Sequence, residues 1–283
     1  MNRTSLVGVD ELAASLADPR LRIVDARFAL TDPSAGRAGY LQSHLPGAVY
    51  ADLNEDLSDL AKTGQGRHPL PDDGAFARRL GEWSITPAHQ VVVYDAGDGS
   101  MAAARLWWML KLLGHDRVAV LDGGLAAWRA QGLAETAELP RLPAAPAYPS
   151  RFNGRLIADA DEVQARLDED SGWLFDARAS ERFRGEVEPI DPVAGHVPGA
   201  VNRPYAQNLR EGRFKPADEL RTELSALLAH RQPADTVLMC GSGVTACHLL
   251  LAFEHAGLHD ARVYAGSWSE WISDPSRPVA RGD

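Results

Sequence analysis

One of the two cysteines in this 283-residue chain lies in a segment whose residue types suit a nucleophile. Residues 237–249 read VLMCGSGVTACHL: a short apolar run, Cys240, a turn with two glycines, and a leucine-rich stretch. Such a turn lets successive N–H groups point into one concavity, to which a following helix adds its positive end. A thiolate, the attacking form of cysteine, is stabilised there. The groups expected to hold the sulfur anion are the N–H groups of Gly241, Ser242, Gly243, Val244 and Thr245.

A free cysteine is more often a small buried hydrophobic residue, and the two cysteines differ in this respect. For Cys240, the adjacent glycines and the start of a helix favour a nucleophile. Cys247 falls on the predicted helix in register with Val244 and Leu251, which indicates a packed core position. A resolving role for Cys247 in a regulatory disulfide is the alternative.

Short apolar runs alternate with longer helical stretches around this segment. Residues 91–94 precede a predicted helix at 101–114, and residues 237–239 precede one at 244–257. Glycines 114 and 257 stand where helices commonly end. This alternation is typical of a parallel sheet covered by helices, whose ligands bind at the carboxyl ends of the strands. Cys240 occupies such an end.

The second half of the sequence repeats motifs of the first half in the same order. In the place of Cys240 the first half has Asp95, which cannot perform thiol chemistry, so only the second half is expected to be catalytic. The matching segments are 22–27 with 173–178, 44–49 with 196–201, 90–95 with 235–240, and 120–128 with 263–271.

Between the two copies the sequence is rich in proline, which favours an extended strap and opposes a helix. The predicted fold class is therefore α/β, with two tandem domains that each contain a parallel sheet flanked by helices. The first, inactive domain is expected at residues 1–138, the linker at 139–150, and the catalytic domain at 151–283.

Composition narrows the possible partners. Hydrophobic residues make up 45% of the chain, its net charge is −10, and it has no run of five basic residues. These features argue against nucleic acid and membrane partners. The start is not like a signal peptide and no apolar stretch is long enough to span a bilayer, so a cytoplasmic location is expected. No clustered metal-ligand motif occurs, and we expect neither a metal nor a cofactor.

The chain contains the repeated Asp-Ala-Arg and His-x-Pro-Gly-Ala motifs, the Trp107–Leu110 segment, the Gly-Gly-Leu-x-x-Trp segment and the cysteine loop. Taken together, these features resemble the tandem-domain rhodanese superfamily of sulfurtransferases. The resemblance covers nearly the whole chain. It implies two rhodanese-like domains, of which the second is catalytic. The Cys-Gly-Ser-Gly-Val-Thr loop is similar to that of 3-mercaptopyruvate sulfurtransferases, whereas thiosulfate enzymes of the mammalian kind usually carry basic residues after the cysteine.

The resemblance also implies roles for residues outside the loop. Arg182 corresponds to the arginine that holds the substrate anion, and His68, in the segment RHPLP, to a histidine that works with the loop serine. Ser242 would hydrogen-bond the substrate carbonyl or protonate the departing enolate. Because His44, His196 and Arg178 belong to motifs present in both halves, they are expected to be structural, with Arg178 paired to Asp176.

One position departs from the mercaptopyruvate pattern. Asp191 stands where these enzymes typically place a second substrate arginine, nine residues after Arg182. An acid there would repel a carboxylate. Either Arg184 or Arg178 compensates, or the enzyme also takes thiosulfate.

The expected reaction moves sulfur from a small anionic donor, 3-mercaptopyruvate, through a Cys240 persulfide to an acceptor. The acceptor would be a small thiol, a thioredoxin-like protein or cyanide. The alternatives are a thiosulfate sulfurtransferase, use of both donors, and a non-catalytic persulfide carrier. A cysteine phosphatase needs arginine six positions after its nucleophile, where this chain has Ala246, and is therefore disfavoured.

Overall fold

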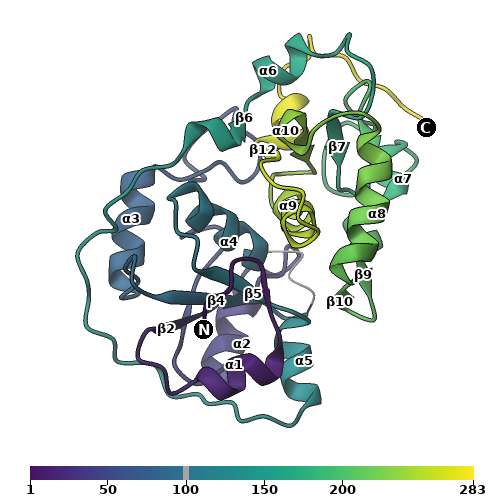
Figure 1. Cartoon of the computed structure of the whole chain (residues 1–283). Helices are drawn as coiled ribbons and strands as arrows, with labels where there is room; N and C mark the ends of the chain where they lie inside the picture. The colour runs from purple at the N-terminus through teal and green to yellow at the C-terminus, as the bar shows by residue number, and fades with distance from the viewer. Residues whose placement is uncertain (98–101) are drawn as a thin grey trace. The chain divides into compact units, whose positions relative to one another are not determined.

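The structure, a computed structural model, describes residues 1–97 and 102–283 (Figure 1). It divides into two compact units, which we call unit 1 (Met1–Asp59 and Leu70–Asn153) and unit 2 (Leu60–Pro69 and Gly154–Asp283). Unit 2 therefore contains a segment from the first half of the sequence. Met101, the expected first residue of a helix, and the end of the loop after Asp95 lie outside the described residues.

Unit 1 is built on a five-stranded parallel sheet with the order β1-β5-β4-β2-β3. Its central strand β4, QVVVY, is buried at all five positions, as expected for a parallel sheet with helices on both faces. The strands are β1 (Leu6–Val7), β2 (Leu21–Asp25), β3 (Ala48–Tyr50), β4 (Gln90–Tyr94) and β5 (Val118–Leu121). The helices are α1 (Val9–Ser15), α2 (Ser34–Gln42), α3 (Asp73–Glu82), α4 (Ala102–Leu112) and α5 (Gly124–Ala130).

Unit 2 repeats this topology with the order β6-β12-β11-β7-β8, again all parallel. The strands are β6 (Ile157–Ala158), β7 (Leu174–Asp176), β8 (Val201–Asn202), β11 (Val237–Met239) and β12 (Arg262–Tyr264), with a separate hairpin of β9 (Leu209–Arg210) and β10 (Arg213–Phe214). The helices are α6 (Ala160–Ala165), α7 (Ser180–Phe183), α8 (Ala217–Leu228), α9 (Thr245–His255) and α10 (Ser267–Trp271), and the 3-10 helices are η1 (Gly154–Leu156), η2 (Tyr205–Asn208) and η3 (Pro233–Asp235). The predicted α/β fold class with one parallel sheet in each half is confirmed.

The motifs shared by the two halves serve equivalent structural contacts. Arg27 pairs with Asp25 at 2.7 Å, and Arg178 pairs with Asp176 at 2.6 Å. In both halves the histidine ring stacks on an aromatic ring and its Nδ1 lies close to a backbone carbonyl, that of Tyr40 for His44 and that of Phe183 for His196. These contacts agree with the structural roles predicted for these residues.

The proline-rich segment lies along unit 1. Residues 139–149, all of them described, form neither helix nor strand. The N–H groups of Ala145 and Tyr148 donate to the carbonyls of Gly81 and Ala77 on α3, at 2.8 and 2.9 Å. A Cβ on Gly81 would lie 2.6 Å from the carbonyl oxygen of Ala145, so the strap requires a residue without a side chain at this point of the helix.

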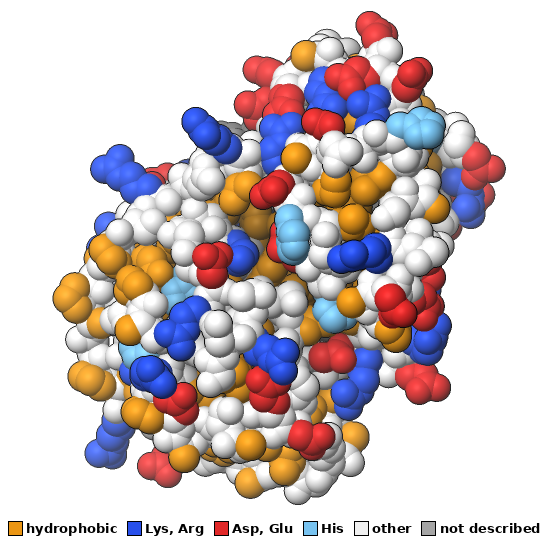
Figure 2. All heavy atoms as spheres, in the orientation of Figure 1, with side chains coloured by type: hydrophobic (Ala, Val, Ile, Leu, Met, Phe, Trp, Pro, Cys, Tyr) orange, Lys and Arg blue, Asp and Glu red, His pale blue; other side chains and the backbone are white. Residues whose placement is uncertain are grey.

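Acidic and basic side chains alternate over the drawn face of the protein (Figure 2). Within residues 1–97 and 102–283, no helix combines the length and the apolar character needed to cross a membrane. The same part of the chain shows no group of three or more His, Cys, Asp or Glu side chains arranged to hold a metal ion.

Candidate active site

Cys240 lies directly after β11 and is 2% exposed. Its N–H donates to Oγ of Ser267 at 3.1 Å, and its carbonyl accepts from the N–H of Trp268 at 3.0 Å. Ser267 Oγ in turn donates to the carbonyl of Tyr264 at 2.8 Å. The loop after the neighbouring strand β12 therefore holds the backbone of the cysteine at the carboxyl edge of the sheet.

Gly243 fixes the turn that follows the cysteine. Its φ is +74°, and a Cβ at this position would lie only 2.1 Å from the carbonyl oxygen of Ala265. The N–H of Ser269 adds a hydrogen bond to the carbonyl of Gly241 at 2.9 Å. Position 243 thus requires glycine for two independent reasons, the left-handed backbone and the close approach of Ala265.

Several N–H groups of this turn are available to an anion. Among the contacts of the described residues there is no acceptor for the N–H groups of Gly241, Ser242, Val244 and Thr245. Helix α9 begins at Thr245, so its N-terminus faces the same turn. These N–H groups provide the kind of concavity that stabilises a thiolate or a persulfide anion.

His68 and Ser242 are in direct contact within unit 2. Nδ1 of His68 lies 2.8 Å from Oγ of Ser242, and both residues are buried. The histidine belongs to the segment Leu60–Pro69, which joins unit 2 although it precedes it in sequence. The structure thus places the predicted histidine beside the predicted loop serine, two residues from Cys240.

Arg182 lies at the end of α7 and is bound by two acidic side chains. Its Nη2 donates to Glu188 Oε1 at 2.7 Å and to Asp191 Oδ2 at 3.1 Å. Burial by itself would raise the pKa of Glu188, but hydrogen bonds from Arg182 and from the N–H groups of Asp191 and Ile190 hold this pKa below its ordinary value. Glu188 is therefore a carboxylate that fixes the orientation of Arg182.

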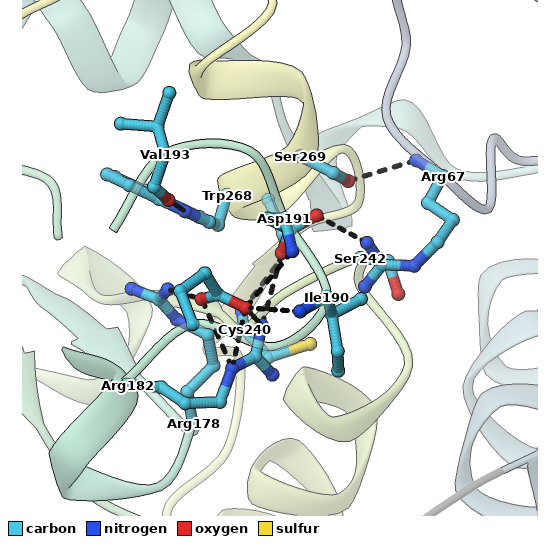
Figure 3. A network of polar contacts seen from close by, with 12 residues as sticks. Arg67, Arg178, Arg182, Ile190, Asp191, Val193, Cys240, Ser242, Trp268 and Ser269 are labelled. Atoms are coloured by element: carbon cyan, nitrogen blue, oxygen red, sulfur yellow. Dashed lines mark hydrogen bonds and ion pairs between the residues drawn. The ribbon is translucent and has the colours of Figure 1, made fainter. Parts of the chain in front are cut away.

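Asp191 also binds Arg67, which was not singled out for a role in the sequence. Nη1 of Arg67 donates to Asp191 Oδ1 at 2.5 Å, and the N–H of Arg67 donates to Ser269 Oγ at 2.9 Å. Figure 3 shows the side chain of Asp191 in contact with Arg67, near Cys240 and Ser242. The sequence offered one signal for Arg67, its position directly before His68.

Arg178 is the deepest of the arginines around the cysteine, with 1% of its side chain exposed. Burial opposes its charge, but Asp176, Glu188 and a charged Cys240 together raise the pKa of Arg178 above its ordinary value. Its guanidinium also lies over the ring of Trp268 at 4.7 Å. Arg178 is thus a fixed positive charge whose field reaches the sulfur of Cys240.

Among the contacts of the described residues, Asp191 is bound by neither Arg184 nor Arg178, the two arginines considered as compensation for its charge. Arg184 forms an exposed pair with Glu186 at 2.8 Å, and Arg178 is occupied by Asp176 and by the carbonyl of Gly195. The charge of Asp191 is instead balanced by Arg67 and Arg182, because each of its carboxylate oxygens accepts from one of them. The prediction missed this because Arg67 is distant from Asp191 in sequence.

Cys247 lies on α9 and is fully buried. Its Sγ donates to the carbonyl of Gly243 at 3.1 Å. This contact agrees with the packed position predicted for Cys247. It also joins helix α9 to the turn that follows Cys240.

Comparison with known proteins identifies the family. The rhodanese-like domain matches residues 8–131 and 159–274, and the chain belongs to this family. The resemblance indicated by the motifs is thereby confirmed, including one rhodanese-like domain in each half.

Relatives along the whole chain carry sulfurtransferase names. A Pseudomonas aeruginosa protein named "Probable 3-mercaptopyruvate sulfurtransferase" is 50% identical, and the alignment covers 100% of both chains. Thiosulfate sulfurtransferase from Bos taurus is 34% identical, over 96% of this chain and 93% of its own. The solved structure of 3-mercaptopyruvate sulfurtransferase from Leishmania major matches with a TM-score of 0.83 and 31% identity, over 95% of this chain and 74% of that one. The predicted enzyme class, a sulfurtransferase, is confirmed.

Proposed function

We propose that this protein transfers sulfur from 3-mercaptopyruvate to an acceptor through a persulfide on Cys240. The observation that carries the proposal is the 2.8 Å contact between His68 and Ser242, in the turn that follows the buried cysteine. A hydroxyl backed by an imidazole suits a donor whose leaving group must take up a proton. The relative at 50% identity supports the same donor by its name.

In the first half-reaction, the Cys240 thiolate attacks the sulfur of mercaptopyruvate. The new S–S bond forms as the C–S bond breaks, and the electron pair of the broken bond passes to the carbon as the enolate of pyruvate. Ser242 donates its hydroxyl proton to this enolate, and His68 returns a proton to Ser242. The outer sulfur keeps the thiol proton of the donor at first, and release of this proton to solvent leaves a persulfide anion that the N–H groups of the turn bind.

In the second half-reaction, an acceptor nucleophile attacks the outer sulfur of the persulfide. Its bond to Cys240 breaks and the thiolate of Cys240 is restored. The acceptor class we propose is a small thiol, a thioredoxin-like protein or cyanide. A cytoplasmic location and domain boundaries at 138/139 and 150/151 stay predictions from the sequence.

Thiosulfate is the second candidate donor. The guanidinium groups of Arg67 and Arg182 both approach Gly241, next to the cysteine, and a dianion would profit from two cations. The Bos taurus relative carries the thiosulfate name. Sulfite leaves thiosulfate without needing a proton, so this donor gives no role to the contact between His68 and Ser242.

The two remaining alternatives are less well supported. A phosphatase would need an arginine at position 246, where the chain has a fully buried alanine. A carrier without catalysis would have no use for the paired arginines or for the contact of His68 with Ser242.

Mass spectrometry of the protein after incubation with each donor tests the proposal. We expect one added sulfur, about 32 Da, on the peptide that contains Cys240, as in other persulfidated thiols. Cys240→Ser should abolish the adduct, whereas Cys247→Ser, the matched control on α9, should keep it. Absence of the adduct with both donors would refute the sulfurtransferase mechanism, and an adduct with thiosulfate alone would refute the donor.

A further inference from the structure

We propose that Ser267 is a positioning residue for the nucleophile, and that its hydroxyl fixes the backbone of Cys240 for sulfur transfer. The inference rests on the proposed function, because it assigns a role in the attack of Cys240 on the donor. It holds for either donor, since the same sulfur atom attacks mercaptopyruvate or thiosulfate.

Ser267 adopts a backbone conformation that is unusual for its residue type and its place. Its φ is +52°, in the left-handed region, and it is fully buried at the first position of helix α10. Four other non-glycine residues among those described have a positive φ, and none of the four begins a helix. A residue with a Cβ loses free energy in this conformation, which persists only where the surrounding structure determines it. The strain indicates that a serine side chain is used at this point.

The hydroxyl of Ser267 has one fixed orientation. Its single proton is donated to the carbonyl of Tyr264 at 2.8 Å, so its lone pairs are left for the N–H of Cys240, which donates to it at 3.1 Å. Cys240 lies one residue beyond β11, which ends at Met239. The hydroxyl therefore holds the N–H of the nucleophile at the point where the strand has ended.

The first turn of α10 also orients the N–H groups of the anion-binding turn. The N–H of Trp268 donates to the carbonyl of Cys240 at 3.0 Å, and that of Ser269 donates to the carbonyl of Gly241 at 2.9 Å. In a planar trans peptide, the carbonyl and the N–H that follows it point in opposite directions. The N–H groups of Gly241 and Ser242 are therefore turned away from α10, as a cradle for the sulfur anion requires.

Unit 1 contains the same loop without the hydroxyl. Gly124 occupies the place of Ser267 and has nearly the same φ, +55°. The next two N–H groups donate to the carbonyls of Asp95 and Ala96 at 2.9 and 3.1 Å, which repeats the pattern around the cysteine. This backbone arrangement thus forms with glycine in the half that lacks the thiol.

The turn after Cys240 leaves room for a side chain that unit 1 excludes. A Cβ on Gly124 would lie 2.5 Å from the carbonyl oxygen of Gly97 and 2.8 Å from that of Asp95. At the equivalent point of unit 2, the side chain of Ser267 is accommodated and fully buried. What the serine adds is the hydrogen bond to the N–H of the nucleophile. A cysteine bound at both its N–H and its carbonyl keeps its sulfur in place, and rates fall steeply when reacting atoms are misplaced by about 1 Å.

Two variants of Ser267 separate the hydroxyl from the backbone strain. Ser267→Gly removes both, which copies Gly124, whereas Ser267→Ala removes the hydroxyl and keeps the strain. Single-turnover persulfide formation should be slowed by about 10-fold or more in both variants with either donor, and the half-saturating donor concentration should stay within about 3-fold of wild type. Ser273→Ala, which removes an exposed hydroxyl that donates to the carbonyl of Glu270, is the matched control and should keep the wild-type rate.

Thermal unfolding shows whether the lower rate is only a loss of stability. Tm should be about 2–4 °C higher in Ser267→Gly than in Ser267→Ala, because glycine adopts the left-handed backbone without strain. The two variants should nevertheless be equally slow. Rates that follow the order of Tm, with the glycine variant close to wild type, would overturn the inference.

Selective isotope labelling of the cysteine amides gives a readout that needs no donor. The chain has two cysteines, and the N–H of the second, Cys247, donates to the carbonyl of Val244 at 3.1 Å. In both Ser267 variants, hydrogen exchange of the Cys240 amide should accelerate by about 10-fold relative to that of Cys247, because one hydrogen bond is lost. Unchanged exchange at Cys240 would overturn the inference.

Failure of this inference can be told apart from failure of the proposed function. Absence of a persulfide on wild-type Cys240 would overturn the proposed function and with it this role of Ser267. A wild-type rate of persulfide formation in both Ser267 variants, together with faster exchange at Cys240, would overturn the positioning role and leave the proposed function intact.

Discussion

Replacing Gly243 by alanine is expected to displace the turn that holds Cys240. The new Cβ would lie 2.1 Å from the carbonyl oxygen of Ala265 and 2.8 Å from its carbon. Since even close C···O contacts measure about 3.3 Å, the turn or the segment at Ala265 must move by about 1 Å. That segment continues into Ser267 and Trp268, which bind the backbone of Cys240.

Two costs contribute to the expected loss of stability. The left-handed backbone at φ +74° costs an alanine about 1 kcal/mol, and the steric overlap costs about 1–3 kcal/mol more. Gly212, in the hairpin of unit 2, is a matched control, because its φ is also +74° and nothing lies within 4 Å of its Cβ position. Gly212→Ala should therefore lose only the first contribution, about 1 kcal/mol.

Urea unfolding and single-turnover persulfide formation measure the two effects. Gly243→Ala should lose about 1–3 kcal/mol more than Gly212→Ala in the free energy of unfolding, and its rate of persulfide formation should fall by at least about 10-fold, because a shift near 1 Å misaligns the nucleophile. Equal losses of stability in the two variants, together with a wild-type rate in Gly243→Ala, would refute the argument that Ala265 confines the turn.

Two further predictions concern the proton-transfer pair and the buried acid beside Arg182. Ser242→Ala should slow persulfide formation from mercaptopyruvate by about 100-fold, because the enolate loses its proton donor, and should change the rate with thiosulfate by less than about 3-fold. Quenched-flow measurements with each donor give the two rates. Equal slowing with both donors would contradict the proposed proton transfer. Because hydrogen bonds hold the pKa of Glu188 below its ordinary value of 4.5, its carboxylate stabilises the folded protein above that pH, and the contribution is lost as the pH falls below it. Glu188→Gln should therefore lose about 1–3 kcal/mol in urea unfolding at pH 7, and the difference from wild type should shrink as the pH falls through the lowered pKa of Glu188. A loss that is independent of pH would show that packing is the cause.

The sequence allowed the prediction of features that are encoded locally. Cys240 follows an apolar run and precedes two glycines, and the structure has a buried strand, a tight turn and a helix in that order. The predicted helix at 244–257 is observed as α9, Thr245–His255, and Gly257 has the positive φ expected at a helix end. Such features depend on backbone preferences of neighbouring residues, which a single sequence displays directly.

Contacts between distant parts of the chain could not be predicted in the same way. Arg67 and Asp191 are 124 positions apart, and His68 and Ser242 are 174 positions apart. His68 was found only through resemblance to a family, and the two arginine partners of Asp191 were not predicted because tertiary structure brings them together. Charge alone does not reveal whether an acid repels a substrate or orients the groups that bind it.

The ten residues Leu60–Pro69 lie in the first half of the sequence but belong to unit 2. A polypeptide cut within the proline-rich strap would leave the half that contains Cys240 without His68, the histidine to which the proposed mechanism gives a proton-transfer role. The first half of the sequence, which has Asp95 in the place of the cysteine, thus contributes a short segment to unit 2. The chain therefore passes between the two units three times, after Asp59, after Pro69 and after Asn153.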